Sequence, residues 1–262
     1  MIRLSFFNEK GGTGKTVFNT CFASWLRYEK GYEVRVQDFD FPSYQLFNMR
    51  AHEIELIRNN SDFTKFITLP PYPLGKIEGK KAYTNDQLRR ITNQIREESK
   101  GDGFYIMDFP GRFLPNDPVH AIAMAGLLDY VIFPIDTDRQ SQTSALLCNG
   151  VLNNPRSLAY MGKEHQNTLA FWNRETRTER TGKRDYYTEV TEIFKKAGIP
   201  VCNNRAREFL SMRREGETFG FIRSTVCYPK LNVRRSAPWL EPLFEEILQR
   251  IMGNKVMYPM GE

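Results

Sequence analysis

The sequence has few residues of the kinds that hold disulfides, structural metals or membrane anchors. It contains four cysteines and three histidines in 262 residues, and the cysteines are scattered without a C-x-x-C pair. This spacing argues against a local zinc site or redox pair, and leaves open only a metal cluster shared between subunits. No apolar run approaches the roughly 20 residues that span a bilayer, and the first apolar stretch is too short for a signal peptide. We therefore expect a cytoplasmic protein with reduced, packed thiols.

Charge is unevenly distributed along the chain. The formal net charge is +6; residues 1–150 carry 18 basic and 18 acidic side chains, whereas residues 151–262 carry 19 and 13. A basic surface confined to the second half suits a polyanion such as DNA or an anionic membrane. A well-solvated surface explains the charge equally well.

Short apolar runs alternate with longer amphipathic stretches, which predicts a doubly wound α/β fold of three layers with a mainly parallel sheet. The length and composition favour one domain over residues 1–262. Pro- and Gly-rich residues 69–81 and basic residues 174–184 are expected to be loops. We expect strands at residues 2–7, 33–38, 104–108, 130–135, 169–173 and 199–203, and helices at about 15–30, 43–57, 85–99, 119–127, 141–153, 187–197 and 238–252.

A glycine-rich segment joins the first predicted strand to the first predicted helix. It reads Lys10-Gly11-Gly12-Thr13-Gly14-Lys15-Thr16. Glycines let backbone N–H groups curl around an anion, and the helix N-terminus adds the positive end of its dipole. Lys15 would neutralise the β- and γ-phosphates of ATP, and the Thr16 hydroxyl would bind Mg²⁺. The segment departs from the strict phosphate-loop pattern at Glu9, where that pattern has glycine.

The additional lysine gives the loop a specific resemblance. Lys-Gly-Gly-x-Gly-Lys-Thr resembles the deviant Walker motif of the ParA/MinD ATPases. The resemblance implies an ATP-dependent homodimer in which Lys10 reaches the phosphates bound by the partner, and slow ATP hydrolysis that depends on dimerisation. A second cation delivered in this way stabilises charge that spreads over the phosphoryl oxygens.

Further positions match family landmarks. The second predicted strand ends in Asp38-Phe39-Asp40, which resembles the Asp-x-Asp of the first switch. The resemblance places Asp38 near Mg²⁺ and makes Asp40 the carboxylate that positions the attacking water. Phe41-Pro42-Ser43 follows, where ParA proteins usually have Pro-Gln-Gly, so the first switch differs in detail.

The third predicted strand ends in Asp108, followed by Phe109-Pro110-Gly111, and resembles a Walker B strand with the second switch. Asp108 would hold Mg²⁺ through water. Asn173 ends a later strand and resembles the asparagine that contacts the base in relatives, although a strand-end turn explains it equally well. Asp136 resembles a position near the dimer interface.

The stretch from Tyr28 to Val34, together with Asp38 to Pro42, is similar to the ParA-like TraA proteins of Bacteroides conjugative transposons. This resemblance implies a role in DNA partition or conjugative transfer, with nonspecific DNA binding and a partner protein that stimulates hydrolysis. The basic residues of the second half would supply the phosphate contacts.

Two other classes of function compete with DNA binding. A MinD-like ATPase that positions membrane or protein partners needs a terminal amphipathic helix with a basic polar face. The final predicted helix instead carries Glu241, Glu245 and Glu246, so a helix packed in the core explains it better. A nitrogenase-like redox enzyme needs cysteines near the second switch, and residues 104–140 contain none. A small-molecule synthetase stays open, without a recognisable substrate site.

Overall fold

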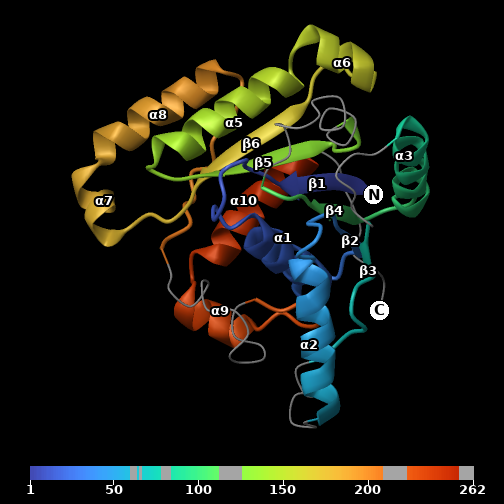
Figure 1. Cartoon of the computed structure of the whole chain (residues 1–262). Helices are drawn as coiled ribbons and strands as arrows, with labels where there is room; N and C mark the ends of the chain where they lie inside the picture. Colours follow the sequence, from blue (N-terminus) through green and yellow to red (C-terminus); the bar gives the residue numbers. More distant parts are fainter. Residues whose placement is uncertain (60–63, 65–66, 78–83, 112–125, 209–222, 254–262) are drawn as a thin grey trace.

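Six parallel strands form one sheet in the order β3-β2-β4-β1-β5-β6 in the computed structural model, which describes residues 1–59, 64, 67–77, 84–111, 126–208 and 223–253 (Figure 1). The strands are β1 (Ile2–Phe6), β2 (Val34–Asp38), β3 (Leu74–Lys76), β4 (Phe104–Asp108), β5 (Tyr130–Ile135) and β6 (Asn167–Trp172). The helices are α1 (Lys15–Ser24), α2 (Gln45–Asn59), α3 (Asn85–Glu98), α5 (Arg139–Leu152), α6 (Pro155–Met161), α7 (Arg177–Gly182), α8 (Arg184–Lys196), α9 (Lys230–Ser236) and α10 (Leu240–Met252). This is the predicted three-layer α/β architecture.

Helices cover both faces of the sheet because both faces are apolar. Every residue of β4 is buried, as expected for a parallel strand between two helical layers. One core contains side chains of α1 and α10 packed on the sheet, and the other contains those of α5 and α8. Figure 1 shows these two helix layers on opposite sides of the strands.

The last predicted strand, residues 199–203, is wrong. Val201 makes a single parallel bridge to Ala170 beside β6, and no further ladder follows among the described residues. Pro200 has no N–H to donate, and the backbone N–H groups of Asn203 and Asn204 donate to Glu246 of α10 at 2.8 Å each. The chain therefore leaves the sheet after this bridge, and contacts the end of β6 again where the Ala206 N–H donates to the Trp172 carbonyl at 2.7 Å.

Both predicted loops contain regular structure. Residues 174–184 include α7, because Thr176 and Glu179 form a capping box at its start. Residues 69–81 include β3, a three-residue edge strand that pairs with β2 only. The predicted helix 119–127 lies largely outside the described residues.

The first predicted helix has about the expected extent, but its last part has a different geometry. α1 stops at Ser24 and continues as a π-helical turn, Trp25–Glu29, before Gly31 adopts a left-handed φ of 73°. The helices α6 and α9 were not predicted. All four cysteines are buried as free thiols, as expected.

Candidate phosphate-binding site

The phosphate loop lies at the carboxyl edge of the sheet, between β1 and α1. Gly12 and Gly14 adopt left-handed φ angles of 74° and 83°, which side-chain-bearing residues rarely take up. A Cβ on Gly14 would also lie 3.3 Å from the Phe18 ring. The loop conformation therefore requires glycine at positions 12 and 14.

Lys15 points back along the loop. Its Nζ donates to the carbonyl of Lys10 at 3.1 Å and lies close to Gly111, where an added Cβ would be 3.1 Å away. Burial lowers the Lys15 pKa, and the charges of Asp108 and Asp40 oppose that shift. The ammonium thus faces the two carboxylates that the sequence assigns to the cation and to water.

The ends of β2 and β4 bring the acidic residues together. Asp38 and Asp108 are direct partners in the strand register. Burial raises the Asp108 pKa to about 7, although Asn19 donates to its Oδ1 at 2.6 Å. Its Oδ2 is buried and has no hydrogen-bond partner among the described residues. The Thr16 hydroxyl also interacts with the Asp108 carboxylate and lowers its pKa. The unpaired Oδ2 fits a cation or its water ligand, which the Thr16 hydroxyl would face as well.

Asp38 and Asp40 occupy different environments. Both Asp38 oxygens accept backbone N–H groups, from Asp40 at 2.9 Å and Phe47 at 3.2 Å, so this carboxylate also fixes the turn that leads into α2. Asp40 lines the cavity beside the loop, and burial raises its pKa while Lys15 lowers it. Asp40 is therefore the carboxylate placed to face a bound ligand.

The loop borders a cavity of about 440 Å³. Besides loop residues and Asp40, the lining includes Asn173 and three arginines, Arg174, Arg207 and Arg223. The Asn173 Nδ2 donates to the Thr13 carbonyl at 2.9 Å, so this predicted base contact also supports the loop. The structure thus brings loop residues, Asp40 and Asn173 to one cavity, whereas Asp38 and Asp108 are fully buried and do not line it.

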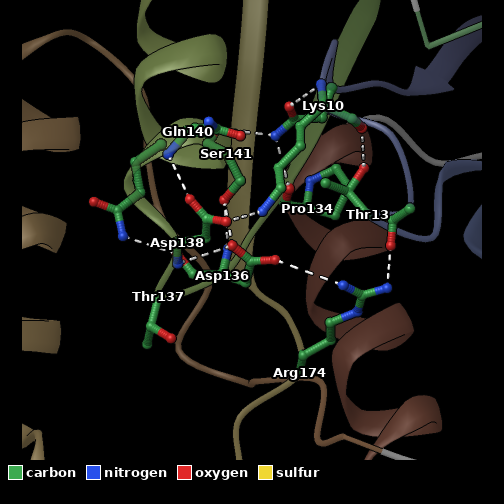
Figure 2. A network of polar contacts seen from close by, with 12 residues as sticks. Lys10, Thr13, Pro134, Asp136, Thr137, Asp138, Gln140, Ser141 and Arg174 are labelled. Carbon is green, nitrogen blue, oxygen red and sulfur yellow. Dashed lines mark hydrogen bonds and ion pairs between the residues drawn. The ribbon is translucent and has the colours of Figure 1, made fainter.

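Lys10 lies outside that cavity, on the β5 side of the loop. Its ammonium is paired with Asp138, and this carboxylate also caps α5 by accepting the Gln140 N–H at 2.8 Å. Asp136 accepts from Ser141 Oγ at 2.6 Å and faces Arg174 at 3.9 Å. Figure 2 shows Asp136 and Asp138 beside Lys10 and Arg174.

Several site residues were not predicted from the sequence. Asn8 donates to the carbonyls of Pro134 and Ser141 at 3.0 Å each and so anchors the start of the loop to β5 and α5. Asn19 accepts the Phe6 N–H at 3.0 Å while it donates to Asp108. The two asparagines can be seen in the sequence, one just after a predicted strand and one a turn into a predicted helix. Their partners Pro134, Ser141 and Asp108 are distant in the sequence, so the sequence alone does not identify these contacts.

Solved structures share this fold. MinD of Aquifex aeolicus has a TM-score of 0.59 at 14% identity, over 98% of this chain and 99% of that one. Apo McdA of Cyanothece gives 0.63 at 17% identity over 97% and 100%, and a ParA-family ATPase of Chlorobium tepidum gives 0.53 at 17% over 96% and 99%. No protein-family model and no curated protein sequence matches the chain. The chain therefore has the fold of the MinD and ParA P-loop ATPases.

Proposed function

We propose that this protein is a Mg²⁺-dependent ATPase that associates with a second copy of itself when ATP is bound and hydrolyses the nucleotide slowly. One observation carries the proposal: Lys15, Asp40 and the loop glycines converge on one cavity, while Lys10 stands outside it. A second lysine outside its own cavity supports a role for Lys10 in the cavity of a second copy.

The residues present fit Mg·ATP. Phosphate oxygens would accept hydrogen bonds from the backbone N–H groups of Gly11, Gly12, Thr13 and Gly14. Lys15 would neutralise the phosphate charge. Thr16 and Asp108 would hold the cation, with Asp38 close by. The Asp108 Oδ2 has no hydrogen-bond partner among the described residues and would be available to that cation. Mg²⁺ would supply charge neutralisation on the phosphates. Structures of similar fold include a Borrelia burgdorferi plasmid partition protein bound to AMPPNP and a McdA variant bound to ATP.

Lys10 must leave Asp138 to act on a partner. The Lys10 side chain is 21% exposed and that of Asp138 is 47% exposed. Such exposed ion pairs contribute little to stability, so a phosphate group competes readily for the lysine. A second copy that receives Lys10 would cover the surface around Asp138 and the neighbouring Asp136. Asp40 would orient the attacking water in each cavity.

We further propose that the cycle serves DNA partition or conjugative transfer, with a partner protein that stimulates hydrolysis. Proteins of similar fold include a plasmid partition protein, which agrees with a role in DNA partition. They also include a MinC:MinD cell division complex, which agrees with a partner protein. The basic second half of the sequence supports DNA as the platform. Several of its cations are already paired, such as Arg205 with Glu175 at 2.7 Å, so only part of the charge is available.

Positioning on a membrane, as an alternative, has less support. The apolar face of α10, including Leu243, Phe244 and Ile247, is buried in the core of this domain. That helix cannot insert in a bilayer without leaving the core. In the part of the chain that the structure describes, no helix has the length and apolar character needed to cross a membrane.

The test is ATP-dependent association measured by sedimentation velocity, together with ATP turnover. We expect wild type to sediment as a dimer with Mg·ATP and as a smaller species with ADP. Lys15→Ala should lose nucleotide binding, and Lys10→Ala should bind ATP but lose about a hundredfold in turnover. Lys100→Ala, which removes an exposed lysine paired with Glu97, is the matched control. Wild-type turnover in Lys10→Ala would remove catalysis across the dimer, and absence of ATP binding by wild type would overturn the proposal.

A further inference from the structure

The strand order indicates which end of the cavity receives the nucleoside. Asp40 follows β2 and Asp108 ends β4, on one side of β1, whereas Asn173 and Arg174 follow β6, at the opposite edge of the sheet. The phosphates and their cation belong with the carboxylates and with Lys15. A nucleotide held in that way extends its base and ribose toward the end of β6.

Arg174 lies at this nucleoside end of the cavity, and the edge of its guanidinium contacts other protein groups. Its guanidinium donates to the carbonyl of Gly12 and faces Asp136 at 3.9 Å, and the side chain lines the cavity while remaining 34% exposed. Hydrogen bonds of a guanidinium lie in the plane of the group. These contacts therefore hold its edge and leave its flat faces available to an aromatic ring.

The backbone around Arg174 holds the side chain in this place. Arg174 adopts a left-handed φ of 60°, which costs free energy in any residue other than glycine. Hydrogen bonds on both sides maintain the conformation: the Asn173 N–H donates to Ile135 at 2.6 Å, and the Glu175 N–H donates to Ala206 at 3.0 Å. Asn173 and Arg174 thus support two consecutive loop carbonyls, those of Thr13 and Gly12.

We propose that Arg174 stacks its guanidinium on the base of the bound nucleotide, an inference that rests on the proposed ATP site. The same contact to Gly12 fixes the distance between the base and the phosphate loop. Stacking uses the face of the base and not its edge, so Arg174 contributes affinity for a nucleobase without reading its identity. Contacts with the edge of the base fall to other groups of the cavity.

Two variants separate stacking from the other tasks of Arg174. Arg174→Lys keeps the positive charge and a donor but loses the plane. Arg174→Gly removes the whole side chain and suits the left-handed backbone, so it should fold at least as well as wild type. The ligands are ATP and ribose 5-triphosphate, which carries the same phosphates without a base. Their affinities are measured by competition against a fluorescent ATP analogue.

We expect both variants to bind ATP about tenfold more weakly than wild type, because stacking on one base is worth about this much. The affinity of Arg174→Lys for ribose 5-triphosphate should stay within about twofold of wild type, since this ligand has no base and the lysine keeps the charge and a donor. Arg177→Lys, on the exposed start of α7, is the matched control and should change neither affinity.

Other outcomes overturn the inference in distinguishable ways. An equal loss for both ligands would make Arg174 a phosphate ligand or a support of the loop, and unchanged ATP affinity would remove it from the site. If wild type bound ATP no better than ribose 5-triphosphate, the base would make no contact worth measuring, and stacking would be excluded. Failure of wild type to bind either ligand would instead overturn the proposed ATPase function.

Discussion

At the scale of single residues, neighbouring aspartates at one strand end are placed for different tasks. Asp38 is fully buried and accepts two backbone N–H groups, whereas Asp40 is partly exposed and lines the cavity with Lys15. The two-residue spacing along an extended chain would point both side chains the same way. The turn after β2 separates them instead, because Asp38 accepts the N–H groups of Asp40 and Phe47.

Asp40→Ala should leave nucleotide binding intact and lower ATP turnover about a hundredfold, since a positioned general base contributes roughly that much. The reason is that Lys15 and the loop amides still hold the phosphates, while the attacking water loses its acceptor. Turnover is followed by phosphate release, and binding by fluorescence of an ATP analogue. Asp102→Ala removes an exposed carboxylate from the turn before β4 and serves as control. Equal turnover in wild type and Asp40→Ala would remove Asp40 from catalysis.

Lys15 was proposed from the glycine-rich motif, and Asp40 and Asp108 from their resemblance to family positions at strand ends. Parallel strands present their carboxyl ends at one edge of the sheet, so such motifs predict residues that lie near one another. The tasks of Lys10 and Arg174 could not be fully assigned in this way. Their present partners, Asp138 and the Gly12 carbonyl, lie 128 and 162 positions away in the sequence. Only the folded sheet brings such groups within hydrogen-bond distance.

At the scale of elements, local signals competed with long-range ones. Residues 199–203 have the apolar composition of a strand, yet Glu246 of α10 takes the backbone N–H groups that a longer ladder would need. Residues 174–184 have the composition of a loop, yet the spacing of Thr176 and Glu179 starts a helix there. Composition alone decided both predictions, and in each case a specific hydrogen bond decided the structure.

The short helix α7 should depend on its cap. Thr176 Oγ1 accepts the Glu179 N–H at 3.2 Å, and Glu179 Oε2 accepts the Thr176 N–H at 3.0 Å. Thr176→Ala should lower the free energy of unfolding by about 1 kcal/mol, the usual contribution of such a cap. Urea denaturation followed by circular dichroism measures this difference.

Thr188→Ala on α8 is the matched control, because this exposed hydroxyl only donates back to the Arg184 carbonyl. It should change the free energy of unfolding by less than about 0.5 kcal/mol. Equal effects of the two substitutions would show that the capping box contributes nothing beyond an ordinary surface threonine.

At the scale of the whole molecule, the balance of charge decides how the protein would meet a polyanion. Ion pairs neutralise part of the basic second half, including Lys183 with Glu179 at 3.1 Å and Arg234 with Glu241 at 3.5 Å. Arg234 is nevertheless mostly exposed, and Arg235 next to it on α9 is exposed as well. A phosphate backbone can compete with such pairs, because exposed ion pairs contribute little on their own.

Asp40→Ala held in the ATP state should therefore bind random-sequence duplex DNA, and should bind it much more weakly with ADP. Contact with about four phosphates would lower the affinity about a hundredfold between roughly 50 and 200 mM salt, because binding releases condensed counterions. Replacing Arg234 and Arg235 together by alanine should weaken binding and reduce the salt dependence, whereas the same change at Lys195 and Lys196, exposed on α8, should do neither. Fluorescence anisotropy of labelled DNA measures the binding of Asp40→Ala with ATP and with ADP, and of the two double replacements. Binding that is the same with ATP and ADP would separate DNA from the nucleotide cycle, and no binding in either state would leave a protein partner as the platform on which the ATPase acts.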